Sequence, residues 1–209
     1  MRKQSTLFPE KEKKFLKELD LAKAQEIADQ VRSAVAGHCV KIEVAGSIRR
    51  QRDKVHDIDF VVVTKTEAEW QKIVEELKRL KAILNCAGDS VIKAFMPWQG
   101  GFFQVDFYRA KPETYGIHLI IRTGSAEHNM WLAGCAISRG MRLKYSQGLI
   151  MKDKVVTGED EQAVFEALGL TWQSPSEREI VDGKPVWQSL EEAQVYEKIW
   201  HNLKDESHS

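Results

Sequence analysis

Two aspartates separated by a single residue, Asp57 and Asp59, stand at the start of an apolar run in VAGSIRRQRDKVHDIDFVVV, residues 44–63. Because side chains alternate across a β-strand, a strand here would place both carboxylates on one face and Ile58 and Phe60 on the other, toward a core. Two neighbouring carboxylates repel each other, and a divalent cation that prefers oxygen ligands relieves this repulsion. The pattern therefore predicts a magnesium site on this strand.

A third carboxylate is available on a later predicted strand, residues 102–108. The apolar residues Phe103, Val105 and Phe107 alternate there, so Asp106 points to the opposite face. If the two strands are neighbours, Asp106 completes a site of three carboxylates. An Asp-x-Asp pair alone is common on surface strands, and the third aspartate makes a metal site the better interpretation.

The residues before the aspartate pair suit the binding of phosphate. Gly46 allows a tight backbone turn, and Ser47 is expected to cap the turn that follows, whose free N–H groups attract phosphate. Positive charge is concentrated in the same short loop, at Arg49, Arg50, Arg52 and Lys54. A basic loop is usually only solvated, but a phosphate-binding loop beside a carboxylate-held metal is the combination that phosphoryl or nucleotidyl transfer requires.

The composition bounds the class of protein. The chain has 209 residues, 43% of them hydrophobic, which is enough for one sizeable core or two small lobes. Its 31 basic and 31 acidic side chains balance, so any binding of nucleic acid depends on a local basic patch. The three cysteines form no CxxC pair, and the N-terminus lacks the hydrophobic run of a signal peptide. We therefore expect a cytoplasmic or nucleoid-associated protein that is neither secreted nor inserted in a membrane.

Hydrophobic periodicity predicts a mixed α+β fold. Helices are expected at residues 12–35, from residue 66 to about residue 84, and at 126–139, 161–168 and 190–203. Strands are expected at residues 41–45, 55–63, 90–96 and 102–108, with shorter strands between residues 141 and 156. The segment TEAEW predicts a capping box, because Glu69 follows Thr66 by three residues. The turn WQGG predicts a hairpin between the last two of the longer strands.

These motifs resemble those of family X DNA polymerases, the group of DNA polymerase beta. The palm of that family carries GSxRR, then DxD, then an aspartate on a later strand, and residues 46–50, Asp57 with Asp59, and Asp106 match these in turn. The segment RTGSAEHN is similar to the family's TGS turn and following Asn, and EDEQAVFEALGLTWQSPSERE is similar to the end of its thumb.

The resemblance implies a particular domain organisation: an α+β nucleotidyltransferase palm, with a mixed β-sheet and helices, followed by a small α/β thumb. The expected order is a flexible tail at residues 1–12, an N-terminal helix and palm at 13–110, a thumb at 111–180 and a C-terminal helical extension at 181–209. The resemblance is thus to a minimal palm-plus-thumb form of the family.

The resemblance also implies the roles of individual residues. Two Mg²⁺ ions, for which Mn²⁺ can substitute, would be held by the catalytic residues Asp57, Asp59 and Asp106. The nucleotide would be bound by Gly46, Ser47, Arg50, Thr123, Gly124, Ser125 and Asn129. In this scheme Ser47 and Arg50 hold the triphosphate, and Asn129 contacts the minor-groove edge of the base. The chain departs from the family at Ile121-Arg122, where two aromatic residues or His-Phe usually precede Thr-Gly.

The function implied is DNA-directed DNA polymerase activity that fills short gaps during repair. The expected partners are gapped or primer–template DNA and deoxynucleoside triphosphates, with the chain acting as a monomer. Two other functions fit the same motifs: template-independent addition to a 3′ end, and nucleotidyl transfer to a substrate other than DNA. An assay of nucleotide addition, rather than the sequence, distinguishes these three functions.

The N-terminus contains a further motif, Gln4-Ser5-Thr6-Leu7-Phe8. It reads Q-x-x-L-F and is similar to the peptides that dock replication proteins onto sliding clamps. Gln4, Leu7 and Phe8 are therefore candidates for binding a clamp, and such tethering would raise the local concentration of DNA. The alternative is that Leu7 and Phe8 fold back onto the first helix.

Overall fold

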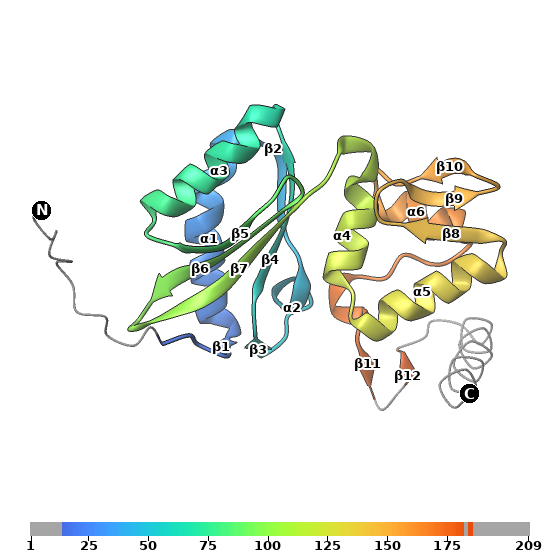
Figure 1. Ribbon diagram of the computed structural model, residues 1–209. Helices are drawn as coiled ribbons and strands as arrows, with labels where there is room; N and C mark the ends of the chain where they lie inside the picture. The colour runs from blue at the N-terminus through green and yellow to red at the C-terminus, as the bar shows by residue number, and fades with distance from the viewer. Residues whose placement is uncertain (1–13, 182–183, 186–209) are drawn as a thin grey trace, which may run out of the picture.

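The computed structural model describes residues 14–181 and 184–185, which form two lobes (Figure 1). The N-terminal lobe, from β1 to β7, contains a five-stranded sheet in the order β2-β4-β7-β6-β5. The C-terminal lobe, from α4 to β12, contains a three-stranded sheet in the order β10-β9-β8. The fold is mixed α and β, as the periodicity predicted.

The elements have the following bounds. Those of the N-terminal lobe are β1 Leu19–Asp20, α1 Leu21–Val35, β2 Cys39–Val44, α2 Gly46–Arg49, β3 Lys54–Val55, β4 Ile58–Thr64, α3 Glu67–Arg79, β5 Ile83–Ala87, β6 Val91–Trp98 and β7 Gly101–Arg109. Those of the C-terminal lobe are α4 Tyr115–Thr123, α5 Ala126–Ser138, β8 Met141–Lys144, β9 Gly148–Met151, β10 Lys154–Thr157, α6 Glu161–Ala167, β11 Ile180–Val181 and β12 Lys184–Pro185. Short 3₁₀ helices occupy Ala36–His38, Pro112–Thr114 and Pro175–Glu177.

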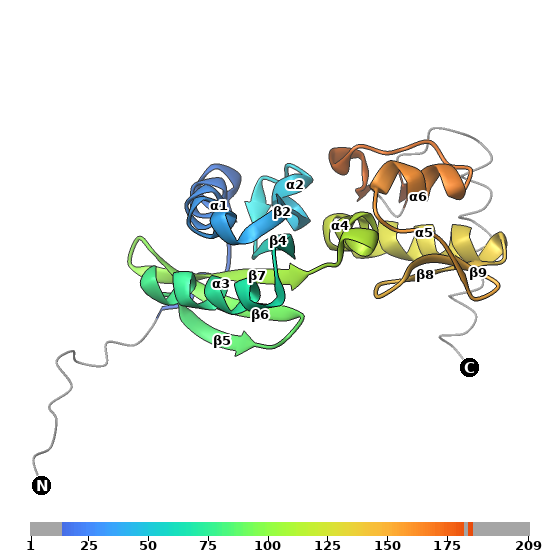
Figure 2. The same cartoon turned by 90° about the horizontal axis from the view of Figure 1, so that it is seen from above.

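The two faces of the five-stranded sheet have different coverings (Figures 1 and 2). On one face, Phe60 and Phe107 are fully buried in a core that also takes in the apolar sides of α1 and α3. On the other face, Val61 and Val63 pack with Leu119 of α4. Since side chains alternate along β4, the residue before Phe60 faces the second lobe. The sheet therefore presents its polar end residues toward the junction of the lobes.

Strand pairing sets the register at the centre of this sheet. Strands β4 and β7 are parallel neighbours, with Asp59 opposite Asp106. Strands β6 and β7 form an antiparallel hairpin in which Trp98 pairs with Gly101, so Gln99 and Gly100 make the turn. The WQGG hairpin is thus confirmed, and its two-residue turn fixes the register along both strands.

The first helix begins later than predicted. It starts at Leu21, and the residues from 14 to 20 are extended rather than helical. The backbone N–H of Leu16 donates to the carbonyl of Phe102 over 2.8 Å, and β1 pairs with β3. Pairing with the sheet outweighs the helical spacing of the apolar residues in this segment.

Two further sequence predictions were wrong or incomplete. Thr66 is the N-cap residue of α3, but its side chain accepts no capping hydrogen bond, so the predicted capping box is absent. Helix α4 was not predicted; its residues from Gly116 to Ile120 are all buried. The clamp-like motif and the helix expected at residues 190–203 lie outside the described residues. Within the described part of the chain, no helix has the length and apolar character needed to cross a membrane.

Candidate active site

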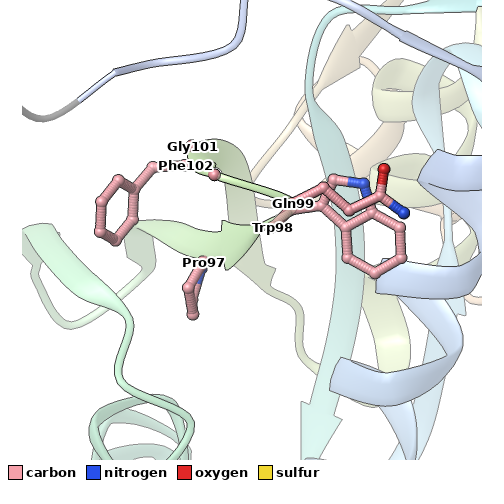
Figure 3. Close-up of a pocket in the computed structure, with 6 residues that line it drawn as sticks. Pro97, Trp98, Gln99, Gly101 and Phe102 are labelled. Atoms are coloured by element: carbon pink, nitrogen blue, oxygen red, sulfur yellow. The ribbon is translucent and has the colours of Figure 1, made fainter.

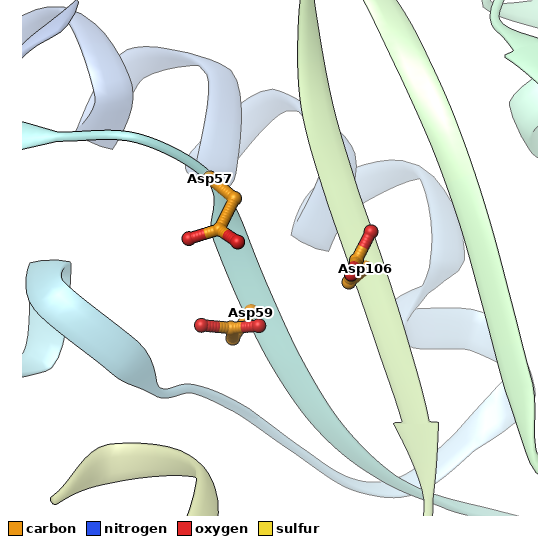
Figure 4. Close-up of side chains that lie close together, drawn as sticks. All are labelled: Asp57, Asp59 and Asp106. Carbon is orange, nitrogen blue, oxygen red and sulfur yellow. The ribbon is translucent and has the colours of Figure 1, made fainter. Parts of the chain in front are cut away.

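Three carboxylates converge on the face of the sheet that looks toward the C-terminal lobe (Figure 4). Asp57 directly precedes β4, Asp59 lies within it, and Asp106 lies opposite Asp59 on the parallel strand β7. One oxygen atom of each carboxylate lies within 4.8 Å of the others. The structure therefore brings together the three aspartates that alternation placed on one face.

The acidic cluster carries an electrostatic cost. Asp106 is 1% exposed, and the other two side chains are partly buried. Burial, together with the charges of Asp57 and Asp106, raises the pKa of Asp59 to about 7. Burial and the charge of Asp106 also raise the pKa of Asp57. Three oxygen donors whose negative charge is costly without a cation fit Mg²⁺ or Mn²⁺.

Asp106 is held by side chains that sequence reasoning did not single out. Lys93 Nζ lies 2.5 Å from Asp106 Oδ2, Gln104 Nε2 donates to both carboxylate oxygens over 3.1 and 3.2 Å, and the Tyr108 hydroxyl lies 3.2 Å from Oδ2. Gln104 and Tyr108 share a strand face with Asp106, and Lys93 is its partner on β6. The predicted hairpin turn could have indicated the contact with Lys93, because the turn fixes the pairing of Lys93 with Asp106.

Gly46 is required by the carboxylate beside it. Its φ of +58° lies in the left-handed region, and a Cβ atom there would lie 2.2 Å from Asp59 Oδ2. The prediction for Ser47 was wrong: α2 starts at Gly46 with Ala45 as its N-cap, so Ser47 caps nothing. The Ser47 Oγ atom is buried and has no hydrogen-bond partner among the described residues. A buried hydroxyl without a partner is a candidate ligand contact.

The basic loop is tied to the C-terminal lobe through Arg49. Its guanidinium donates two hydrogen bonds to the carboxylate of Glu161, over 2.9 and 2.7 Å, and one to Thr123 Oγ1 over 2.8 Å. The fully buried Arg178 donates to the same carboxylate over 2.7 Å. Burial alone would raise the pKa of Glu161, but the two arginines outweigh it and lower that pKa. A carboxylate between two arginines joins the lobes.

Arg50, the predicted triphosphate ligand, makes a second connection between the lobes. Its Nε donates to Glu179 Oε1 over 2.5 Å, and its Nη1 donates to the carbonyl oxygen of Thr123 over 2.6 Å. Arg52 also lies 3.7 Å from the carboxylate of Glu179. The Glu179 carboxylate of the C-terminal lobe therefore binds the guanidinium of Arg50, the group that was predicted to bind phosphate.

The predicted sugar and base contacts lie at the turn before α5 and in its first turn. The Ser125 hydroxyl caps α5 by accepting from the backbone N–H of His128 over 3.1 Å. Asn129 Nδ2 donates to the carbonyl oxygen of Ile121 over 2.7 Å, and a Cβ atom on Gly124 would lie 2.7 Å from Asn129 Oδ1. These side chains make internal contacts that order the turn beside Arg50.

Arg122 is a second cation near the carboxylates that the family motif did not anticipate. Its guanidinium carbon lies 3.5 Å from the centre of the Tyr108 ring and 5.1 Å from that of Tyr145. Tyr145 in turn stacks on His118, with ring centres 3.7 Å apart. The charge of Arg122 lowers the pKa of Asp59, although burial and the other aspartates outweigh it. Arg122 therefore packs between the rings of Tyr108 and Tyr145, at the junction of the lobes.

A separate hollow lies at the tip of the β6–β7 hairpin (Figure 3). Its lining residues are Pro97, Trp98, Gln99, Gly100, Gly101 and Phe102. The rings of Trp98 and Phe102 point away from each other. None of these side chains titrates, so the hollow offers no acid, base or charged ligand, and the acidic cluster is the candidate active site.

Comparisons with known proteins agree with this architecture. Residues 118–179 match the sequence model of the DNA polymerase beta thumb. The fold is similar to the crystal structure of Leishmania infantum polymerase beta in a ternary P/T complex, with a TM-score of 0.68 and 19% identity. That match covers 78% of this chain and 77% of the other. The fold is therefore similar to that of polymerase beta, and the sequence of the C-terminal lobe is similar to its thumb.

A curated sequence narrows the class. The DNA polymerase/3′-5′ exonuclease PolX of Bacillus subtilis is 29% identical over 143 residues, or 68% of this chain. The chain is thus similar to the family X DNA polymerases, and the part of its C-terminal lobe from residue 118 to residue 179 is similar to their thumb. Because of this similarity, the N-terminal and C-terminal lobes are called the palm and the thumb below. The aligned region is 25% of the PolX sequence, so the chain spans about a quarter of the length of that relative.

Proposed function

We propose that the chain is a DNA-directed DNA polymerase that adds deoxynucleotides to a primer 3′-hydroxyl. The observation that supports this most directly is the convergence of Asp57, Asp59 and Asp106 within 4.8 Å in a palm-like fold. In nucleotidyl transfer, the 3′-oxygen forms a bond to the α-phosphorus, the bond from that phosphorus to the bridging oxygen breaks, and pyrophosphate leaves. Two Mg²⁺ ions, when bound, lower the pKa of the hydroxyl and neutralise phosphate charge.

In this proposal, each residue of the acidic cluster and the nearby Gly46 has a separate role. Asp57 and Asp59 would hold both ions, and Asp106 would hold one of them and help activate the primer hydroxyl. Mn²⁺ has the same preference for oxygen ligands and can substitute for Mg²⁺. Gly46, without a side chain, lets the triphosphate approach closely.

The triphosphate is gripped by the loop that follows β2. The partnerless hydroxyl of Ser47 and the guanidinium of Arg50 are its proposed contacts, and Arg50 exchanges the Glu179 carboxylate for a phosphate oxygen when the nucleotide binds. The turn at Thr123, Gly124 and Ser125, already held beside Arg50 by the bond to the Thr123 carbonyl, lines the sugar. Asn129 contacts the base edge after giving up its bond to the backbone.

The substrate proposed is gapped or primed DNA, in keeping with short-gap repair. The net charge is zero, so the grip on DNA comes from local basic residues and should weaken steeply as salt rises. Synthesis by the chain alone is expected to be distributive, with few nucleotides added per encounter. A clamp bound through Gln4, Leu7 and Phe8 would offset this weak grip.

Primer extension tests the proposal. The chain, with Mg²⁺ and deoxynucleotides, is given the same labelled primer as a single strand, on an open template and at a short gap. We expect templated extension that is best at the gap, and a loss of at least about a thousandfold with Asp106→Ala. Asp29→Ala, which removes an exposed carboxylate from α1, is the matched control and should extend normally.

Three results would contradict the proposal. Extension of the single strand without a template would indicate terminal addition, and no extension of any DNA would indicate another substrate. Near-normal extension by Asp106→Ala, with circular dichroism showing the native fold, would remove this carboxylate from the mechanism.

A further inference from the structure

Asp106 already has a cationic partner before any metal is considered. The Lys93 ammonium lies 2.5 Å from Asp106 Oδ2, which is the geometry of a charge-assisted hydrogen bond. Gln104 and Tyr108, the other side chains that contact this carboxylate, are not cations. Lys93 is therefore the positive charge in direct contact with the third carboxylate.

The fold both directs Lys93 to this carboxylate and leaves it free to move. Lys93 is the direct partner of Asp106 in the antiparallel pairing of β6 with β7, so the two side chains extend from one face of the sheet. The Lys93 side chain is 38% exposed, whereas that of Asp106 is 1% exposed. A lysine ammonium on a flexible stem with access to water can withdraw from the carboxylate without being buried elsewhere.

The other two carboxylates are not paired in this way. In the described part of the chain, neither Asp57 nor Asp59 has a side-chain hydrogen bond or an ion pair with a lysine or arginine, and burial raises the pKa of both. They lack the direct cationic partner that Asp106 has, although the charge of Lys93 lowers the pKa of both without contact. The acidic cluster is thus asymmetric, with one neutralised carboxylate and two that are not.

From this asymmetry, and given the metal site of the proposed function, we infer that Lys93 is a positioning residue that competes with the divalent cation for Asp106. An ammonium and a divalent cation repel each other at such short range, so both cannot contact the same carboxylate oxygen at full strength. The cation position that includes Asp106 therefore fills only when Lys93 withdraws. Among the described residues, no ammonium is in direct contact with Asp57 or Asp59, so the position that these two form fills first.

Metal binding by the full chain tests the inference without DNA or nucleotide. Mn²⁺ is titrated into protein first freed of metal with a chelator, and the unbound ion is followed by electron paramagnetic resonance. Lys93→Met should bind Mn²⁺ at least about tenfold more tightly than the unchanged chain. Lys93→Arg keeps the charge and should stay within about threefold of the unchanged chain.

Two controls separate competition from a general change in charge. Lys72→Met removes an exposed ammonium from α3 of the same lobe and should leave the affinity unchanged. In the Asp106→Ala background, Lys93→Met should no longer tighten binding, because the two residues form one thermodynamic cycle. Thermal melting of each variant confirms that it is folded before its affinity is compared.

The inference is overturned if Lys93→Met and the unchanged chain bind Mn²⁺ within twofold of each other, or if neither binds it. It is also overturned if Lys72→Met tightens binding equally, or if the gain persists without Asp106. Because the titration contains no DNA or triphosphate, the proposed polymerase activity can fail while this result stands, and the reverse also holds.

Discussion

The candidate site residues of the palm and of the thumb differ in the hydrogen-bond partners that they have. In the palm, Asp57 and Asp59 have raised pKa values, and the buried Ser47 hydroxyl has no hydrogen-bond partner among the described residues. In the thumb, Ser125 caps a helix and Asn129 donates to a backbone carbonyl, although the Oδ1 atom of Asn129 has no hydrogen-bond partner among the described residues. Asp57, Asp59 and Ser47 thus have no side-chain partner among the described residues, whereas Ser125 and Asn129 each make an internal bond that holds their turn in place.

This difference assigns separate tasks to the two lobes. Groups that are buried without a partner are stabilised when a ligand or ion binds, so they mark the place where chemistry is expected. Groups with internal partners form a rigid platform whose position depends on how the lobes are joined. In this chain the joint is the pair of arginines in the basic loop, which contact carboxylates of the thumb.

Breaking the joint should have the largest effect on stability. Glu161→Ala leaves Arg178 fully buried without its carboxylate and removes both bonds from Arg49. We expect a loss of about 3–5 kcal/mol in the free energy of unfolding, measured by urea denaturation. Glu166→Ala, an exposed substitution on the same helix, is the control and should cost less than about 1 kcal/mol. Equal losses would mean that the thumb platform does not depend on this joint.

The raised pKa of Asp59 predicts that the free energy of unfolding depends on pH. The pKa of Asp59 is about 7 in the folded chain, against 3.8 for the free side chain, so the folded state favours the protonated carboxyl. Its contribution to stability is full below about pH 4 and is lost as the pH rises through 7. Metal-free Asp59→Asn should match the unchanged chain at pH 4 and exceed it by about 2–4 kcal/mol at pH 8.

The measurement is a series of thermal or urea melts in chelator, with Asp29→Asn as an exposed control. Adding Mg²⁺ at pH 8 should stabilise the unchanged chain and narrow its difference from Asp59→Asn, because the cation replaces the proton. A difference between the two proteins that stays constant from pH 4 to 8 would show that Asp59 carries no such cost.

The smallest effect is expected at Glu179, where the thumb competes for a palm residue. Glu179→Gln removes the charge that engages Arg50 and Arg52, and it should tighten binding of a non-hydrolysable deoxynucleoside triphosphate about threefold to tenfold. Calorimetric titration measures this, and Glu166→Gln serves as the control. Weaker binding would show instead that Glu179 orients Arg50 for the phosphate.

Much of the palm site could be predicted from local patterns. Alternation along two apolar strands placed Asp57, Asp59 and Asp106 on the face opposite Phe60 and Phe107, and the structure pairs those strands. The turn between β6 and β7 could also be predicted from its sequence, WQGG. These features depend on short segments whose period and turn residues specify their geometry directly.

The rest depends on contacts between distant segments. The joint made by Arg49, Glu161 and Arg178 links residues that no local pattern connects, and the bond from Arg50 to Glu179 has the same character. Helix α4 was not predicted, and it is buried on nearly every side by contacts with other elements. The start of α1 was misplaced because sheet pairing overrode the helical spacing near Phe15.

The parallel pairing of β4 with β7 also has a consequence for biosynthesis. Parallel neighbours need a long crossover, here the whole of α3, β5 and β6, so Asp106 is translated well after its partner Asp59. A nascent chain therefore cannot assemble the three carboxylates until β7 has left the ribosome, and the thumb emerges only after that. The three carboxylates of the palm are therefore complete first, and the thumb residues proposed to line the nucleotide are added to them afterwards.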